Sequence, residues 1–248
     1  MSIRVGVAGW SIPPAFATQF PSSGTHLERY GTRFSVVEIN SSFYRPHRRT
    51  TYERWAASVP PAFRFSVKLP KAITHEHRLV DCQALMERFA EETSGLGDKR
   101  GPILIQLPPS FAYPGDIAEQ FLSDLKSLTT GGPLVLEPRH VSWFQPEVDR
   151  MLKRQQVSRV AADPAKPLQA AQPGGWEDLV YFRLHGSPRI YESPYGEQDI
   201  EVRAKAVASL NAHGVDVWTI YDNTTYGAAT KNALELEDAV RRQRQSGQ

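Results

Sequence analysis

Cysteine, long apolar runs and net charge are all scarce in this sequence. Cys82 is the one cysteine among 248 residues, which excludes an intrachain disulfide and a thiolate-rich metal centre. No run of about 18 apolar residues is present, so we expect no membrane-spanning helix. A formal net charge of +2 gives no general attraction to nucleic acids or membranes. Residues 1–6 show no signal-peptide pattern, so we expect a soluble, cytoplasmic protein with no membrane partner.

Segments that favour strands alternate with segments that favour helices along the whole chain. The predicted strands are Ile3–Ala8, Val36–Asn40, Arg64–Leu69, Pro102–Leu107, Leu134–Arg139, Val157–Asp163, Leu179–His185 and Asp216–Asn223. The predicted helices are Thr25–Tyr30, Thr50–Ser58, Leu79–Thr93, Asp116–Leu128, Pro146–Gln155, Gln198–His213 and Asn232–Arg242. This alternation is typical of βα units around a parallel sheet.

We therefore predict an α/β fold: a single (β/α)8, TIM-barrel-like domain with parallel strands over residues 1–248. A chain of this length is ordinary for one such barrel. The connection Pro164–Trp176 shows no helical pattern and is expected to be irregular, and about the last eight residues are expected to fray. No G-x-G-x-x-G motif follows the first strand, so we expect no nucleotide cofactor.

Polar residues gather at the C-terminal ends of the predicted strands. They recur at every second position, as in Glu137-Pro-Arg139 and Arg183-Leu-His185. Side chains two apart on a strand point to the same face, and barrel enzymes carry their catalytic groups at this end. We therefore predict one site at the barrel mouth. Its polar candidates are Glu38, Asn40, Lys68, Gln106, Glu137, Arg139, His140, Asp163, Arg183, His185 and Asn223.

The charged members of this set indicate the chemistry. The candidates to hold an anion are Arg139, Arg183 and Lys68, with Asn40, Gln106 and Asn223 as further binding residues. The candidates for general acid–base catalysis are Glu137, Glu38, His185 and His140. An unpaired buried ion costs several kcal/mol, so these groups must pair with one another or face water. A salt-bridge network with a purely structural role is the alternative for any one of them.

Aromatic residues follow the same strand ends. Flat rings beside arginines suit the face of a sugar or base that carries an anionic group. The aromatic candidates for ligand binding are Trp10, Tyr44, Trp143 and Tyr191. Packing at the barrel mouth is the alternative, and we favour it for Phe43.

A divalent metal is a less favoured interpretation of the same strand ends. Carboxylate and imidazole ligands suit such a metal, and the residues that would hold it are Glu137, Asp163 and His185. No spacing motif such as H-E-x-x-H supports this set. His75-Glu-His77 has a His-x-His spacing, but we expect these histidines in a solvated loop. Ser142 lacks the G-x-S-x-G context of a serine nucleophile.

Several short strings occur in a fixed order along the chain. They include Val7-Ala-Gly-Trp-Ser11, Val37-Glu-Ile-Asn-Ser-Ser-Phe-Tyr-Arg45, Phe65-Ser-Val-Lys68, Glu137-Pro-Arg-His140 and Tyr181-Phe-Arg-Leu-His-Gly186. In these strings the chain resembles the YecE-like family, domain of unknown function 72, over nearly its whole length. The resemblance implies a TIM barrel in a mostly bacterial family without an established activity. The chain departs from the family at Pro138, where phenylalanine is usual, and at Ala8, where serine or threonine is frequent.

Three functions fit these expectations. The favoured one is an enzyme, a hydrolase, isomerase or lyase, that binds a small anionic ligand such as a sugar or nucleotide phosphate or a carboxylate. The second is a metal-dependent phosphodiester hydrolase that acts on nucleic acid. The third is a non-catalytic module that only recognises its ligand.

Overall fold

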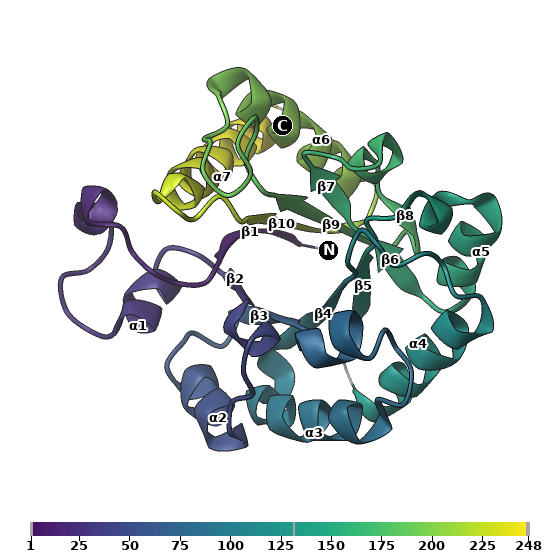
Figure 1. The fold of residues 1–248 in the computed structure, drawn as a ribbon. Coiled ribbons are helices and arrows are strands. Elements are labelled where there is room, and N and C mark those ends of the chain that lie inside the picture. Colours follow the sequence, from purple (N-terminus) through teal and green to yellow (C-terminus); the bar gives the residue numbers. More distant parts are fainter. Residues whose placement is uncertain (1, 131, 247–248) are drawn as a thin grey trace.

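The computed structural model describes residues 2–130 and 132–246. It shows a ring of strands surrounded by helices (Figure 1). The strands of the ring are β1 (Ile3–Ala8), β2 (Val36–Ile39), β3 (Arg64–Lys68), β4 (Arg100–Gln106), β5 (Leu134–Glu137), β6 (Val157–Arg159), β7 (Ala161–Asp163), β9 (Leu179–Leu184) and β10 (Asp216–Tyr221). Their hydrogen-bonded order is β7-β9-β10-β1-β2-β3-β4-β5-β6, and the paired strands of this ring are parallel. The prediction of a TIM-barrel-like α/β fold is confirmed.

The barrel closes through the segment predicted as one strand, Val157–Asp163. The structure divides it at Val160, so that β6 pairs with β5 and β7 pairs with β9. The following connection contains a 3-10 turn, Leu168–Ala171, and a short strand, β8 (Gly174–Gly175), that pairs antiparallel with β6. This connection carries no α-helix, and the change of partner at Val160 joins the two ends of the sheet.

The outer helices are α1 (His26–Gly31), α2 (Arg49–Ala57), α3 (Gln83–Thr93), α4 (Asp116–Leu128), α5 (Pro146–Arg154), α6 (Glu197–Ala212) and α7 (Ala228–Ser246). The predicted start of the third long helix at Leu79 is wrong, because Leu79 and Asp81 have positive φ angles and α3 begins only at Gln83. The tail expected to fray is helical over residues 241–246, and residues 247 and 248 lie outside the described residues. The fifth strand ends at Glu137 rather than Arg139, because Pro138 has no N–H to continue the ladder.

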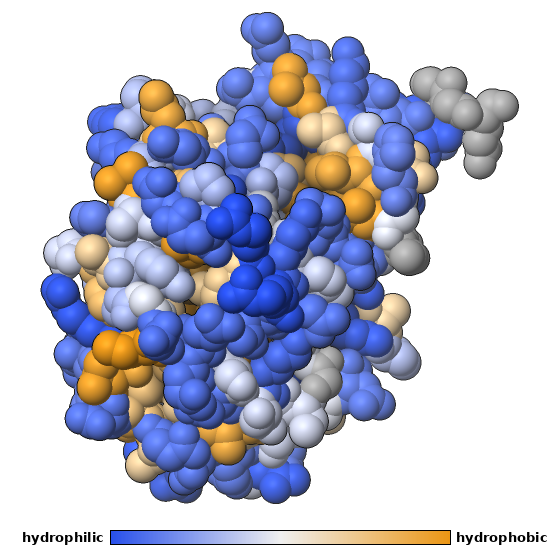
Figure 2. All heavy atoms as spheres, turned by 90° about the vertical axis from the view of Figure 1, so that its right-hand side faces the viewer, coloured by the Kyte–Doolittle hydropathy of each residue, from blue (hydrophilic) through white to orange (hydrophobic). Residues whose placement is uncertain are grey.

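The buried apolar side chains form two clusters, and the polar side chains lie mostly on the surface. The larger apolar cluster lies between the strands and the helices, and a smaller one fills the inside of the barrel. Turned by 90° from Figure 1, Figure 2 shows a flank that is mostly hydrophilic, with apolar side chains in separate groups. None of the helices in the described residues combines the length and the apolarity that a membrane crossing requires.

Inside the barrel, five of the strands change from apolar to polar toward their C-terminal ends. The alternation of faces along a strand places the members of each pair on the same, inner side, and all of them are buried. The pairs are Val36 and Glu38, Leu104 and Gln106, Val135 and Glu137, Tyr181 and Arg183, and Ile220 and Asp222. The apolar members lie in the inner cluster, so the polar members form a layer above it, at the C-terminal mouth.

Candidate active site

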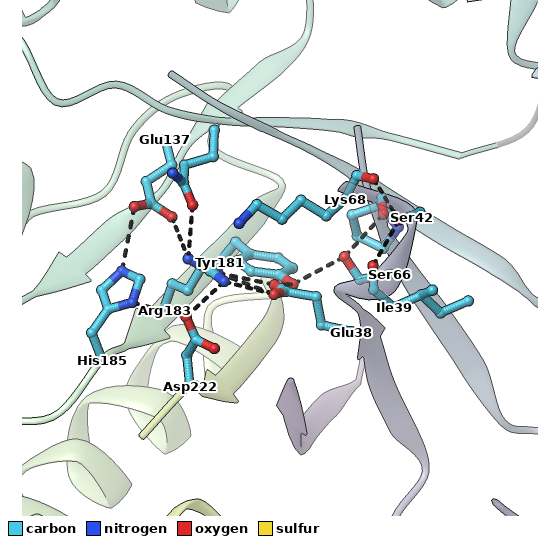
Figure 3. Close-up of polar contacts among 12 residues, drawn as sticks. Glu38, Ile39, Ser42, Ser66, Lys68, Glu137, Tyr181, Arg183, His185 and Asp222 are labelled. Carbon is cyan, nitrogen blue, oxygen red and sulfur yellow. Dashed lines mark hydrogen bonds and ion pairs between the residues drawn. The ribbon is translucent and has the colours of Figure 1, made fainter. Parts of the chain in front are cut away.

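Arg183, on β9, is the centre of an ion network inside the barrel (Figure 3). Its side chain is fully buried, and each of its three guanidinium nitrogens contacts at least one acceptor. The acceptors, at 2.8–3.3 Å, are the carboxylates of Glu38, Glu137 and Asp222 and the carboxamide oxygen of Gln106. Burial lowers the pKa of Arg183, but the three carboxylates outweigh this and raise it well above its usual value. Arg183 therefore stays charged and ties several strands together.

Neutral groups complete the network below Arg183. The Tyr181 hydroxyl lies 2.9 Å from Glu38 Oε2 and 2.9 Å from Ser66 Oγ, and all three side chains are completely buried. Burial, followed by the charge of Glu38, raises the pKa of Tyr181 well above its usual value, so its hydroxyl remains a donor. Both oxygens of Glu38 are thus occupied by protein donors. This position favours a structural role for Glu38 over the predicted acid–base role.

His185 lies between two carboxylates just beyond the end of β9. Its Nδ1 is 3.1 Å from Asp222 Oδ2, and its Nε2 is 3.3 Å from Glu137 Oε1 without a well-directed hydrogen bond. Burial lowers the pKa of His185, but Glu137 and the contact with Asp222 raise it above its usual value. Burial raises the pKa of Glu137, but Arg139 and Arg183 hold it well below its usual value. His185 is therefore the better proton donor and acceptor near neutral pH, and Glu137 stays a carboxylate.

Two cations of the mouth keep donors that the protein does not use. Arg139 donates from Nε and Nη2 to Glu137 Oε1 at 2.9 and 2.7 Å, whereas its Nη1 donates to none of the described residues. The Lys68 ammonium lies 4.1 Å from the ring centroid of Phe43 and forms no hydrogen bond or ion pair within residues 2–130 and 132–246. Burial, followed by repulsion from Arg183, lowers the pKa of Lys68 to about 8.

A π-helical turn, Ala72–Glu76, brings His75 to the same mouth. The His75 ring meets the Phe43 ring edge-on at 5.0 Å. Burial lowers the pKa of His75, and the charges of Lys68 and Arg139 lower it further. π-Helical turns are rare and frequently occur at functional sites. The prediction of a solvated loop missed His75, because no periodic pattern marks a π-helical turn.

A cavity of about 290 Å³ opens at this mouth, between the ends of β5, β7 and β9. Its lining includes Glu137, Arg139, Lys166, His185, Ile190 and Tyr191. The volume is near the lower end of the range for small-molecule sites. A ligand in the cavity would meet Arg139, Glu137 and His185 directly, while Glu38 and Arg183 lie beneath them.

Tyr191 forms part of the cavity wall in an unusual backbone conformation. Its φ angle is 69°, in the left-handed region that costs a residue with a Cβ atom. Its N–H donates to the carbonyl of His185 at 2.5 Å, and its carbonyl accepts from the N–H of Thr225 at 3.0 Å. The ring stands edge-on to the His185 imidazole at 5.8 Å and is 42% exposed. Such strain is concentrated at functional sites, which supports a role for Tyr191 at the cavity.

The other predicted aromatic residues do not line the cavity. Trp143 is buried, and its indole N–H donates to the carbonyl of Phe111 at 2.9 Å. Trp10 packs edge-on against Trp55, with ring centroids 4.9 Å apart. Tyr44 is 69% exposed and lines a separate groove outside the barrel. Proximity to a strand end in sequence therefore did not determine where these rings point.

Of the predicted polar residues, only Glu137, Arg139 and His185 belong to the described lining of the cavity. The others are Glu38, Asn40, Lys68, Gln106, His140, Asp163, Arg183 and Asn223. Asn223 is buried and donates to the Oδ1 of Asn232 at 3.1 Å. The Oδ1 of Asn40 is buried without a hydrogen-bond partner among the described residues. His140 Nδ1 accepts from the N–H of Ser142 at the start of a 3-10 turn and lies 2.9 Å from its hydroxyl. The structure gives Asn223 and His140 local hydrogen-bonding roles.

The predicted metal ligands do not converge on one point. Asp163 Oδ1 accepts a hydrogen bond from the hydroxyl of Tyr195 at 3.0 Å. In the described part of the chain, no group of three or more histidine, cysteine or acidic side chains is arranged to hold a metal ion. The arrangement of Glu137, Asp163 and His185 therefore does not support the metal-dependent alternative.

Asp222, rather than Asp163, is the acid that joins the network, and the sequence analysis missed it. The interpretation of the last strand chose Asn223. The inner cluster contains Trp218 and Ile220, and the next residue on that face is Asp222. Counting the alternation forward from Trp218 would have identified it.

A second hollow, of about 360 Å³, opens at the opposite end of the barrel. Its arginines include Arg64 and Arg100, which donate to backbone carbonyls there. Barrel enzymes use the C-terminal mouth, so the smaller cavity is the candidate site.

Comparisons with known sequences agree with this description. The family described as "Protein of unknown function DUF72" matches residues 4–248. The UPF0759 protein YecE of Escherichia coli strain K12 is 30% identical over 178 residues, which cover 69% of this chain and 62% of YecE. The chain thus spans less than two thirds of that relative's length. The UPF0759 protein YunF of Bacillus subtilis strain 168 is 23% identical, over 94% of this chain and 93% of YunF.

Solved structures show the same fold. A DUF72 family protein of Enterococcus faecalis V583 superposes with a TM-score of 0.82 at 22% identity, covering 97% of this chain and 96% of that one. A DUF72 family protein of Thermotoga maritima MSB8 gives 0.79 at 23% identity, covering 97% and 100%. At these identities the likeness shows the barrel fold alone. The family match over nearly the whole sequence confirms the resemblance found in the strings above, and the chain belongs to the DUF72 family.

Proposed function

We propose that the protein is an enzyme whose barrel mouth binds a small ligand with a phosphate or carboxylate group. The observation that carries this proposal is the unmatched positive charge at the mouth. Lys68 has no acidic partner among the described residues, and Arg139 keeps one free nitrogen beside an open cavity. Guanidinium and ammonium groups with unused donors suit an oxyanion.

The charge balance of the site supports the same proposal. The three carboxylates of the network are Glu38, Glu137 and Asp222, and the cations in contact with them are Arg183, Arg139 and, when protonated, His185. A protonated Lys68 is a further positive charge without a counter-ion. A buried charge of this kind is costly, and an anionic ligand would neutralise it.

Within this proposal, His185 is the group that exchanges protons with the ligand. Its imidazole reaches the cavity, and its contacts with Asp222 and Glu137 fix its orientation. Glu137 holds Arg139 and His185 in place as a permanent carboxylate. An enzyme therefore fits the arrangement better than a module that only binds, since an anion-binding module needs no buried proton-exchanging group between two acids.

Calorimetric titration with inorganic phosphate and with oxalate at pH 7 tests the proposal. We expect both anions to bind, and each of Lys68→Met and Arg139→Gln to weaken binding roughly tenfold or more, because charged hydrogen bonds contribute about 1.5–3 kcal/mol. Lys153→Met is the control, because Lys153 lies on α5 and pairs with Glu177. Absence of binding to the unmodified protein, or equal losses in the control, would refute the proposal.

A further inference from the structure

Lys68 is the least satisfied charged group inside the barrel. It is the last residue of β3 and only 5% exposed. Figure 3 shows its ammonium pointing across the barrel, away from its own strand and toward the side of Glu137 and Arg183. The groups that act on it electrostatically come from four other parts of the barrel: Glu38, Glu137, Arg183 and Asp222. None of the three acids forms an ion pair with it, because each is already held by Arg183.

These surroundings make the neutral amine of Lys68 available nearer to neutral pH than the amine of an exposed lysine, since they lower its pKa to about 8. Removal from water disfavours the charge, the nearby Arg183 repels it, and the acids that could compensate it are engaged elsewhere. A neutral lysine amine is a good nucleophile toward carbonyl carbon, and desolvation or a neighbouring cation is the usual way in which proteins produce one. Within the described residues, the charged form is favoured by the cation–π contact with Phe43 and by the longer-range attraction of Glu38, Glu137 and Asp222.

We propose that Lys68 forms an imine with a carbonyl group of the ligand, which therefore carries a carbonyl close to its anionic group, as in a 2-oxo acid or a ketose phosphate. This inference rests on the proposed function, because Arg139 would hold the anionic group at the cavity. The carbonyl then lies on the inner side of the anion, toward Lys68.

The step balances without any oxidant or further reactant. The nitrogen lone pair of Lys68 forms a bond to the carbonyl carbon, the C=O π pair moves to oxygen, and the His185 imidazolium supplies a proton to that oxygen. The nitrogen loses its two protons in the course of the reaction, the first at the addition step and the second at the dehydration step. One returns to His185, and the other leaves with the hydroxyl group as water. Amine and carbonyl thus become imine and water, and His185 ends as it began.

An imine at this position would define the class of reaction. When protonated, it withdraws electrons from the bonds of the adjacent carbon and so favours loss of a proton or cleavage of a carbon–carbon bond there. Isomerase or lyase chemistry follows from that property, and hydrolase chemistry does not.

Reductive trapping tests the imine. The protein is incubated at pH 7.5 with pyruvate or with dihydroxyacetone phosphate and sodium cyanoborohydride, and the adducts are located by peptide mass mapping. We expect Lys68 to be labelled at least tenfold faster than any exposed lysine, and Lys68→Arg and Lys68→Met to lose this label. Lys71→Arg is the matched control, because Lys71 lies three positions away, is 48% exposed and pairs with Glu76.

Phosphate titration of the same preparations separates the two proposals. If phosphate binds but neither carbonyl compound labels Lys68 selectively, the imine is refuted and anion binding stands. If Lys68 is labelled but phosphate does not bind, the imine stands and the anion-binding part fails. Labelling spread over the exposed lysines, unchanged in Lys68→Arg, also refutes the imine.

Discussion

Two layers of polar residues lie at the same end of the barrel, and they differ in how completely their charges and hydrogen-bonding groups are matched. The inner layer consists of Glu38, Ser66, Tyr181 and Arg183, all fully buried, with every guanidinium nitrogen of Arg183 in contact with an acceptor. The outer layer consists of Lys68, Arg139, His185 and Tyr191. Arg139, His185 and Tyr191 line the cavity, and Lys68 points its ammonium toward the side of Glu137 and Arg183. Lys68 and Arg139 keep unused donors, and Tyr191 has a strained backbone.

Burial of charge at a barrel mouth therefore does not by itself identify a functional residue. A network whose members all satisfy one another has a structural role, even when it lies where barrel enzymes carry their sites. A charged group that keeps unpaired charge or unused hydrogen-bond donors beside an open cavity is a more specific sign of ligand binding. If this distinction holds, substitutions in the inner layer reduce stability and substitutions in the outer layer mainly affect ligand binding.

Arg183→Met should have the largest effect. It leaves three carboxylates without their common partner, and removing one member of a buried ion pair costs about 3–5 kcal/mol. Urea denaturation should show this loss of unfolding free energy. Arg159→Met is the control, because its partner Asp149 is 36% exposed and can regain water, so its loss should be less than half as large. Equal stability of Arg183→Met and the unmodified protein would show that the inner layer is not structural.

Lys68→Met should stabilise the protein instead. The pKa of Lys68 is lowered to about 8, and one pKa unit corresponds to about 1.4 kcal/mol. Below pH 8 the folded protein carries the full cost of the buried charge, so the variant should gain on the order of 2 kcal/mol at pH 7. As the pH rises from 8 to 10.5, the folded form releases its proton before the unfolded form and the advantage should shrink. A loss of stability at pH 7 would place Lys68 in the inner layer.

His185→Gln should have a smaller, pH-dependent effect. The pKa of His185 is raised by Glu137 and Asp222 despite its burial. Its stabilising contribution is therefore complete below the unfolded value near 6.5 and is lost as the pH rises through the folded value. The variant should lose roughly 1 kcal/mol at pH 5.5 and much less at pH 9, measured by urea denaturation. A loss that is independent of pH would contradict the protonation of His185 between the two acids.

The barrel could be predicted from the sequence because alternation of strand and helix patterns extends over the whole chain. The period-two polar pattern at the strand ends likewise identified Glu137, Arg139, Arg183 and His185. It could not separate the two layers, because pairing depends on contacts between strands far apart in sequence. Glu38 and Arg183 illustrate this, since their contact joins β2 to β9.

The residues that were missed or misplaced depend on local geometry that sequence patterns do not encode. His75 reaches the mouth through a π-helical turn. Trp143 follows β5 closely but turns into the core, where its indole meets the carbonyl of Phe111. Asp222 was the exception, because the sequence alone predicts it: Trp218, Ile220 and Asp222 occupy every second position and so share the inner face of the strand.

Tyr191 should show the smallest effect on stability and still affect the ligand. Tyr191→Gly removes about 1 kcal/mol of backbone strain at a φ of 69°, and loss of the ring contact with His185 costs about the same. The unfolding free energy should therefore change by less than about 0.5 kcal/mol, while binding of dihydroxyacetone phosphate weakens roughly threefold or more. Tyr191→Phe, which keeps the ring, should bind nearly as well as the unmodified protein. If Tyr191→Gly lost stability and bound the ligand normally, Tyr191 would belong with the structural residues, and strain at the mouth would cease to distinguish the outer layer.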